Sequence, residues 1–269
     1  MSKTIIITGA STGIGRATAL FFREKGWNVV ATMRRPDAAD QALKDSGALL
    51  LPLDVTSEES INAALDEALR VFSKIDVVVN NAGYGAVGPF ETATQKQIRT
   101  QFETNVFGLM NVCRRIIPHF REERDGVIIN VASMGGRITF PLYSLYHGTK
   151  WAVEGFTEGL SYELQPFNVR VKIIEPGPIK TDFYDRSMES TRGDGETAYD
   201  SFIARAMPNM QKAGETAPGP EVVANAIFKA ATDGSWKIRY QANSRMILCL
   251  RRLLPDSMFN SIIRKAVLK

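Results

Sequence analysis

The sequence has few thiols and few metal ligands. It holds only two cysteines, Cys113 and Cys249, and two histidines, His119 and His147, among 269 residues. Both cysteines have apolar neighbours, which predicts two free, buried thiols in a reducing compartment and excludes a disulfide framework. Two cysteines and two histidines cannot supply a zinc cluster of normal size. We therefore expect no metal site, and zinc-assisted alcohol oxidation is excluded.

Long apolar runs and a strong charge of one sign are also missing. No uninterrupted apolar stretch approaches the roughly 18 residues of a membrane span, and the N-terminus lacks the pattern of a signal peptide. The 33 basic and 29 acidic residues leave a formal net charge of +4. This small excess favours anions such as nucleotide phosphates but predicts no nucleic-acid surface. We therefore expect a soluble, cytoplasmic protein.

What the sequence does contain is a regular alternation of short β-branched runs and longer segments with helical periodicity. Such alternation is typical of repeated βα units around a parallel sheet, whose buried strands are continuous apolar runs. We expect one doubly wound, Rossmann-type α/β domain over residues 1–269, a length common for such folds. Its strands are predicted at residues 4–8, 28–32, 48–53, 76–80, 126–132, 169–174 and 236–240.

Local signals mark where helices begin and end. Gly26 is predicted to stop the first helix in a left-handed conformation. Thr56 with Glu59, and Thr94 with Gln97, have the spacing of capping boxes. The regular pattern weakens near residues 182–220, which are rich in Ser, Gly, Asp, Glu and Met. A long stretch of this kind inside a compact domain is predicted to be a loop that faces the substrate.

The stretch "TGASTGIG" lies between the first predicted strand and the first predicted helix. Unpaired N–H groups at a helix N-terminus form an anion site, and side chains there would block a phosphate. Gly9 permits the tight turn, Gly13 lets the backbone approach a pyrophosphate, and Gly15 allows the helix to lie against the sheet. Ser11 and Thr12 add hydroxyl donors. This turn predicts dinucleotide binding.

The end of the second strand indicates which dinucleotide is bound. An NAD enzyme normally has an acidic residue there, which binds the ribose 2′-hydroxyl. This chain reads "VVATMRRPD" instead, so that Arg34 and Arg35 offer charged, planar donors to a 2′-phosphate. We therefore expect NADP(H) as the cofactor. The alternative is a pair of solvated arginines at a strand end.

Four polar residues form a set that suits hydride transfer to a carbonyl group. Tyr146 and Lys150 share one face of a predicted helix, and Ser133 follows a buried strand at the edge where α/β sheets bind ligands. An ammonium group beside a phenol, whose pKa is ordinarily about 10, favours the phenolate, so Lys150 would tune Tyr146 as general acid and base. Ser133 would bind the substrate oxygen. Asn105, on a long helix, would either hold Lys150 and a water chain or contact backbone.

His147 permits a second interpretation, a hydrolase with Ser133 as its nucleophile. No Gly-x-Ser-x-Gly elbow surrounds Ser133, and the neighbour of Tyr146 on a helix points about 100° away from it. We therefore expect His147 to support the site from behind or to lie at the surface.

Five motifs in order resemble the short-chain dehydrogenase/reductase family. They are "TGASTGIG", Asp54 with Val55, "NNAG", Ser133 with "YHGTK", and "EPGPIKT". The resemblance implies an NADP(H)-dependent oxidoreductase that acts on the CH–OH group of donors. It assigns Asp54 and Val55 to the adenine, residues 81–83 to its ribose, and residues 176–181 to the nicotinamide. With the residues above, the cofactor site is Gly9, Ser11, Thr12, Gly13, Ile14, Gly15, Arg34, Arg35, Asp54, Val55, Asn81, Ala82, Gly83, Tyr146, Lys150, Pro176, Gly177, Ile179 and Thr181.

Within the family, the motifs look most like the hydroxysteroid, retinol and carbonyl reductase branch. The chain departs from the usual Ala-Ser before the catalytic lysine, where it has Gly148 and Thr149. A mobile segment and scattered apolar residues favour a small hydrophobic aldehyde or ketone over a charged sugar. The positions expected to face it are Phe140, Leu142, Tyr143 and Phe183.

The sequence also permits other functions and contacts. An NADP(H)-sensing binding protein would keep the fold without turnover, against which the intact catalytic set argues, and a methyltransferase would bind S-adenosylmethionine. The apolar, basic tail over residues 244–269 is expected to dock on the protein's own sheet or close the pocket, with subunit contact or an anionic membrane as alternatives. The long apolar helices expected near residues 102–117 and 151–164 could form an interface in a homo-oligomer, either a dimer or a tetramer. The alternative is that they are buried only against the core of their own subunit.

Overall fold

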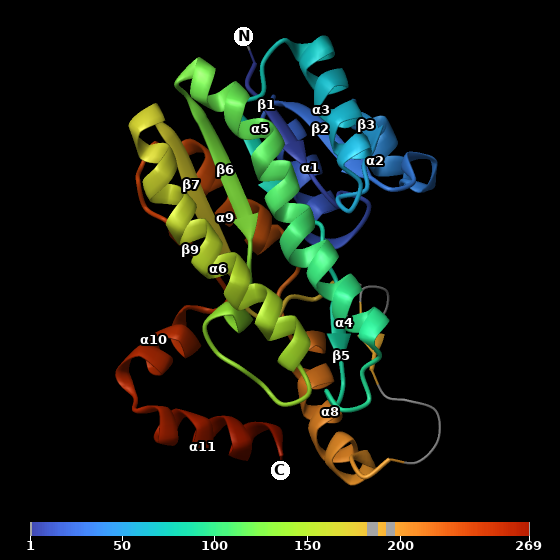
Figure 1. Ribbon diagram of the computed structural model, residues 1–269, viewed down its shortest axis with the longest axis vertical. Helices are drawn as coiled ribbons and strands as arrows, with labels where there is room; N and C mark the ends of the chain where they lie inside the picture. The colour runs from blue at the N-terminus through green and yellow to red at the C-terminus, as the bar shows by residue number, and fades with distance from the viewer. Residues whose placement is uncertain (1, 182–187, 192–196, 269) are drawn as a thin grey trace.

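The computed structural model describes residues 2–181, 188–191 and 197–268. Its main feature is a parallel sheet of seven strands in the order β3-β2-β1-β4-β6-β7-β9 (Figure 1). A strand lies at or next to each predicted position, and the Rossmann-type α/β fold is confirmed. The strands are β1 (Thr4–Ile7), β2 (Asn28–Met33), β3 (Leu49–Pro52), β4 (Val77–Asn80), β6 (Gly126–Val131), β7 (Val169–Pro176) and β9 (Arg239–Ala242).

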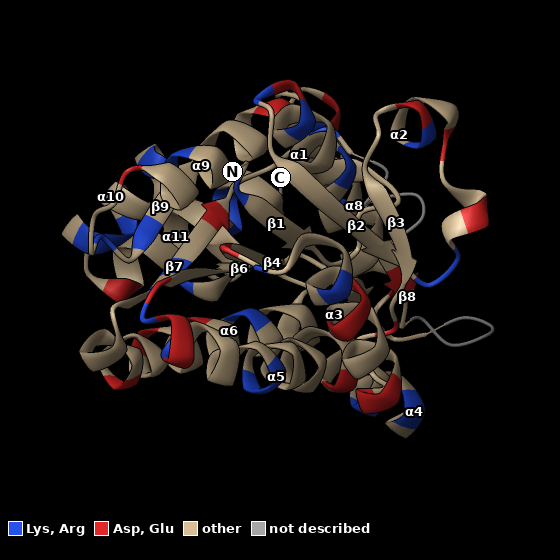
Figure 2. Cartoon of the chain, turned by 90° about the horizontal axis from the view of Figure 1, so that it is seen from above, with Lys and Arg blue, Asp and Glu red and all other residues tan. Residues whose placement is uncertain are grey.

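Helices cover both faces of this sheet (Figure 2). Side chains of successive strand residues alternate between two apolar clusters: Ile5 and Ile7 pack on one face and Ile6 on the other. Both clusters are closed to solvent, which explains why the strands are continuous apolar runs. One face carries α1 (Gly13–Glu24), α2 (Gln41–Asp45) and α9 (Glu221–Thr232), and the other carries α3 (Glu58–Phe72), α5 (Leu109–Glu123) and α6 (Ser144–Leu164).

The strand order creates a crevice for a ligand. From β1 the chain builds outward through β2 and β3, and it then returns to place β4 on the other side of β1. The carboxyl ends of β1 and β4 therefore flank a topological switch point, where open α/β sheets bind ligands. Because all seven strands are parallel, β6 and β7 end at the same edge.

The helix ends follow the predicted signals with one correction. Gly26 has a φ of 79° and ends the segment after α1, as expected. Helix α3 does not begin with a box at Thr56, because that residue's hydroxyl and N–H are both bound by the Asp54 carboxylate. Ser57 caps α3 instead, accepting a hydrogen bond from the Ser60 N–H at 3.2 Å.

The predicted long helix that carries Asn105 is interrupted. The capping box of Thr94 and Gln97 is present at the start of α4 (Gln95–Phe102). A π-helical turn, Glu103–Gly108, then joins α4 to α5 and holds Asn105. Such turns recur at functional sites, because the wider ring redirects a side chain without ending the helix.

The segment predicted to be a loop contains regular structure. Strand β8 (Met188–Ser190) pairs with β5 (Gly85–Val87), and α8 (Asp200–Glu215) follows it; residues 182–187 and 192–196 lie outside the described part. Helix α8 buries only Ala206 and Gly214 and contains Pro208. The last strand, β9, begins at Arg239 rather than at Trp236, which is exposed.

The tail forms two helices, α10 (Arg245–Leu253) and α11 (Asp256–Val267). They pack against an apolar cluster that includes Ile138 and Ala206, not against the sheet. The prediction of two buried thiols is wrong for Cys249, which faces outward from α10, and right for Cys113. No helix in the described ranges is long and apolar enough to cross a membrane.

Candidate active site

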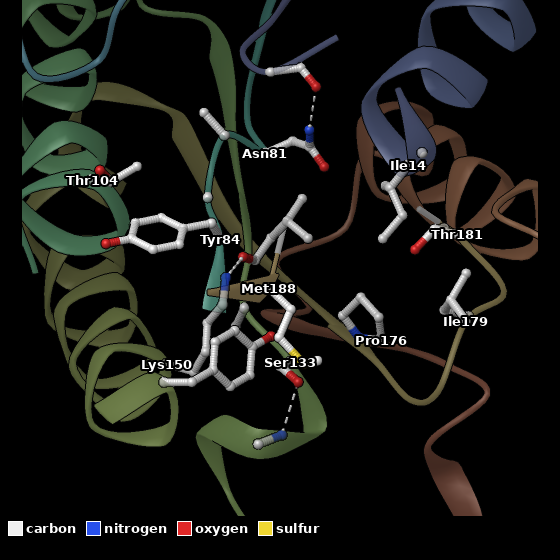
Figure 3. Close-up of a pocket in the computed structure, with 18 of the residues that line it drawn as sticks. Ile14, Asn81, Tyr84, Thr104, Ser133, Lys150, Pro176, Ile179, Thr181 and Met188 are labelled. Atoms are coloured by element: carbon white, nitrogen blue, oxygen red, sulfur yellow. Dashed lines mark hydrogen bonds between the residues drawn. The ribbon is translucent and has the colours of Figure 1, made fainter. Parts of the chain in front are cut away.

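A cavity of about 680 Å³ opens at the carboxyl edge of the sheet, a size that suits a small organic ligand. Figure 3 shows Lys150 and Ser133 on one side of it, with Ile14, Ile179 and Thr181 across from them. Three predicted site residues, Gly15, Arg35 and Asn105, do not line it. The predicted residues that do are Gly9, Ser11, Thr12, Gly13, Ile14, Arg34, Asp54, Val55, Asn81, Ala82, Gly83, Ser133, Tyr146, Lys150, Pro176, Gly177, Ile179 and Thr181.

The glycine turn after β1 is packed too tightly for side chains. Gly9 and Gly13 have φ values of 67° and 54°, in the left-handed region. A Cβ on Gly9 would lie 2.8 Å from the Cα of Ala82, and one on Gly15 would lie 2.3 Å from the Gly9 carbonyl oxygen. The Asn81 amide donates to that same oxygen at 3.0 Å. Bare backbone therefore faces the crevice beside a helix N-terminus, which fits the pyrophosphate of a dinucleotide.

The two arginines after β2 differ in position. Arg34 lines the cavity, whereas Arg35 precedes a short turn, Pro36–Ala38, and does not. Both are exposed, and neither makes an ion pair within the described part of the chain. The Arg34 guanidinium therefore lies at the rim of the cavity without an ionic partner among the described residues.

Tyr146 and Lys150 lie one turn apart on α6. The Lys150 side chain is buried, and its Nζ donates to the Val131 carbonyl oxygen at 2.9 Å, at the end of β6. That Nζ is 5.7 Å from the centre of the Tyr146 ring. Burial lowers the pKa of Lys150 to about 8, an effect that Glu154 opposes. A cation whose charge responds to pH near neutrality therefore stands beside the phenol.

Ser133 and its loop are held by His147. The Ser133 hydroxyl accepts a hydrogen bond from the Gly135 N–H at 3.0 Å. The buried His147 ring accepts the Phe140 N–H at Nε2 (3.1 Å), so its Nδ1 carries the proton and donates to the Gly135 carbonyl oxygen at 2.9 Å. Burial lowers the pKa of His147 to about 4. Both ring nitrogens are used by backbone, which removes the base that a Ser-His hydrolase requires.

Asn105 contacts backbone, one of its two predicted alternatives. Its Oδ1 accepts from the Tyr84 N–H at 3.0 Å, and its Nδ2 donates to the Tyr84 carbonyl oxygen at 2.8 Å and to the Thr149 hydroxyl at 3.1 Å. The Thr149 hydroxyl in turn donates to the Tyr146 carbonyl oxygen at 2.7 Å. Asn105 therefore joins the segment after β4 to α6, and makes no bond to Lys150.

A buried acid pair, which the sequence analysis missed, lies behind Lys150. Glu154 is one turn further along α6, and Glu175 is near the end of β7. Arg239 Nε lies 3.0 Å from Glu154 and 3.7 Å from Glu175, and Arg137 lies 3.4 Å from Glu175. Burial and the charge of Glu175 raise the pKa of Glu154 to about 7. The spacing of Lys150 and Glu154 was a visible signal, but the arginines come from distant segments.

Other residues of the cavity were also missed. Tyr84 follows "NNAG" directly, so its position was inferable, whereas Met188 on β8 and Met210 on α8 reach the cavity only through tertiary packing. The Tyr84 hydroxyl is buried without a partner among the described residues. Burial, and to a smaller extent the negative charge of Glu189, raises the pKa of Tyr84 to about 12.

The predicted substrate-facing residues are partly brought together. Phe140 and Tyr143 line the cavity, while Leu142 packs in the cluster beneath the tail. Phe183 lies outside the described residues. The aromatic pair and the two methionines make one end of the cavity apolar.

Comparisons with known proteins identify the family of this chain. The family model described as short chain dehydrogenase matches residues 3–192. An uncharacterized oxidoreductase of Schizosaccharomyces pombe is 39% identical over 235 residues, covering 87% of this chain and 98% of the relative. A 3-ketodihydrosphingosine reductase of Bacteroides thetaiotaomicron is 33% identical over 266 residues, covering 97% of each chain.

A solved structure has the same fold and carries a nucleotide. The short chain dehydrogenase/reductase of Burkholderia phymatum in complex with NAD superposes with a TM-score of 0.82 and 26% identity, covering 94% of this chain and 92% of that one. The glycine turn, the switch-point crevice and the family match describe a nucleotide-binding oxidoreductase. The chain belongs to the short-chain dehydrogenase/reductase family.

Proposed function

We propose that this protein reduces an aldehyde or ketone with NADPH, and oxidises the corresponding alcohol in reverse. The observation that carries the proposal is the meeting of Tyr146, Lys150 and Ser133 at one cavity with the glycine turn. When bound, the nicotinamide supplies the hydride. The protein's own task is then to orient the carbonyl and supply a proton.

In this proposal, Tyr146 donates the proton to the substrate oxygen. The Lys150 ammonium favours the phenolate that this transfer leaves behind. The Ser133 hydroxyl already accepts the Gly135 N–H, so its own proton is available to the substrate oxygen, where negative charge develops. A positioned general acid contributes about 10²–10⁴ in rate.

The preference for NADPH rests on Arg34. It stands at the rim of the cavity without an ionic partner in the described ranges, and no acidic side chain precedes Asp37 after β2. A 2′-phosphate would pair with this guanidinium, whereas the 2′-hydroxyl of NADH would find no carboxylate.

The apolar end of the cavity favours a hydrophobic substrate. Phe140, Tyr143, Met188 and Met210 line it. Retinoids, ketosteroids and simple carbonyls fit the branch that the motifs resemble. The name of the relative 3-ketodihydrosphingosine reductase suggests a long-chain ketone as a further candidate substrate.

We further propose that the chain acts as one domain within a homo-oligomer. Phe107, Trp151 and Tyr162 are exposed on the neighbouring helical segments at α5 and α6. Large aromatic side chains at the surface are typical of subunit interfaces. Two free thiols accord with a cytoplasmic site of action.

The test is NADPH oxidation against a panel of aliphatic aldehydes, retinal, ketosteroids and 3-ketodihydrosphingosine, with NADH as the cofactor control. We expect turnover with at least one hydrophobic carbonyl and a preference for NADPH. NADPH binding without turnover on any panel member would favour the cofactor-sensing alternative. Preference for NADH would overturn the role given to Arg34.

A further inference from the structure

The C-terminal helix pair, α10 and α11, leaves an unusual amount of apolar surface uncovered. Five of the twelve large apolar side chains exposed in the described part of the chain lie on these two helices. Met246 is 86% exposed and Leu253 is 79% exposed. The five are Met246, Leu250, Leu253, Met258 and Ile262.

Each helix of the pair has a second apolar stripe beside the one that it buries. On α11, Phe259 and Ile263 face inward, whereas Met258 and Ile262, also four residues apart, face outward. On α10 the outward residues are Met246, Leu250 and Leu253, at positions i, i+4 and i+7. Residues at this spacing share one helix face. The outer stripes therefore repeat the pattern of a helix that packs on a surface.

Basic residues accompany these outer stripes. Residues 245–267 contain five basic residues and one acidic residue, a formal charge of +4, which equals the formal net charge of the whole chain. The acidic residue, Asp256, is already paired with Arg251. Arg245 and Arg252 are exposed on α10, and Lys265 is exposed three residues after Ile262. Apolar side chains flanked by arginine and lysine are typical of helices that lie in the interface of an anionic bilayer.

We propose that the C-terminal helix pair docks on an anionic phospholipid surface. Its apolar stripes would enter the boundary between headgroups and acyl chains, and its basic residues would contact lipid phosphates. A second copy of this chain fits less well, because a twofold contact opposes the same patch on both subunits and would bring its uncompensated positive charges together.

The position of the pair gives the docking a consequence for the cavity. Met134, Phe140 and Met210 line the cavity and also belong to the apolar cluster that holds the pair. Figure 1 shows α10 and α11 at the end of the molecule toward which the sheet strands point. Docking would therefore bring the apolar end of the cavity close to the lipid, whichever carbonyl compound it accepts.

The test is co-sedimentation of the full chain with vesicles of phosphatidylcholine, with and without phosphatidylglycerol. We expect binding only to the anionic vesicles, weakened by added salt. Arg245→Gln with Arg252→Gln should lower the partition coefficient roughly fivefold for each arginine. Met246→Ser with Leu253→Ser should also lower it, because the inserted area is lost. All four side chains are exposed, so the variants are expected to fold.

A matched control uses two exposed lysines on the α1 and α9 side of the sheet. Lys25→Gln with Lys229→Gln removes the same charge and should leave vesicle binding unchanged. Equal binding to neutral vesicles, or an equal loss in this control, would overturn the proposal. A third result would also overturn it. If the native chain does not bind vesicles, and a variant of these exposed residues dissociates an oligomer in light scattering without lipid, the patch is a subunit interface.

Discussion

Acidification should destabilise the protein through His147. Its ring is buried, and both nitrogens bond to backbone groups of the loop that carries Ser133. Burial lowers the pKa of His147 from the ordinary 6.5 to about 4. Between these two pH values, His147 is protonated in the unfolded chain but neutral in the folded protein. Stability from this group is therefore complete above about pH 6.5 and is lost as the pH falls toward 4.

The size of the effect follows from the two pKa values. Between about pH 7 and about pH 5, the linkage relation gives a loss of about 2 kcal/mol for His147 alone. Glu154 acts in the opposite direction, because its pKa is raised to about 7 and protonation on acidification relieves a buried charge. Because the two contributions have opposite signs, the pH dependence of the native protein's free energy of unfolding shows only their sum. Comparison with a variant of each residue separates them.

The variant is His147→Gln, which replaces the imidazole with an amide that can still hydrogen-bond but does not titrate. Its free energy of unfolding, measured by urea titration and tryptophan fluorescence, should lie furthest below the native value near neutral pH. The gap should narrow by about 2 kcal/mol at about pH 5. Glu154→Gln is the companion, and its difference from the native protein should change with the opposite sign. A gap for His147→Gln that is constant or widens on acidification would refute the assignment of a neutral, buried imidazole.

Four further outcomes are expected. Gly15→Ala should weaken NADPH binding in a fluorescence titration and cost roughly 1–3 kcal/mol of stability, because its Cβ would meet the Gly9 carbonyl oxygen. Arg34→Ala should raise the KM for NADPH roughly tenfold or more and leave that for NADH unchanged, since a charged hydrogen bond is worth about 1.5–3 kcal/mol; equal effects on both would count against a 2′-phosphate contact. The kcat/KM should fall as the pH rises through about 8, where Lys150 loses its charge, and a flat profile there would contradict its role. Asn105→Ala should cost about 1–3 kcal/mol in thermal unfolding, because it leaves the Tyr84 N–H without its acceptor, while the Tyr84 carbonyl oxygen keeps its bond from Gln101.

Much of the fold was predictable because local patterns and global packing agree. Strand β1, for example, is apolar over residues 5–7 because both faces of the sheet are covered. Likewise, the glycine turn is recognisable because crowding against Ala82 and the Gly9 carbonyl excludes side chains. The alternation of strand and helix then fixes which segments end at the ligand edge.

What escaped prediction depends on contacts between distant segments. The acid pair of Glu154 and Glu175 meets Arg137 and Arg239 only in the folded chain. The composition of residues 182–220 predicts a loop, whereas Ala206 and Met210 hold α8 there through contacts with the apolar cluster of the tail. The sequence predicts His147 either behind the site or at the surface, and its bonds to Gly135 and Phe140 in the folded chain show that it lies behind the site. Periodicity cannot report such tertiary partners.

The central claim is that Tyr146 donates the proton in an NADPH-dependent reduction. Its most direct test compares the native enzyme with Tyr146→Phe on whichever carbonyl compound the native enzyme reduces, while NADPH binding is measured in parallel by fluorescence. The account predicts that turnover falls by about 10²–10⁴ and that the Kd for NADPH stays the same. Undiminished turnover in Tyr146→Phe would contradict it.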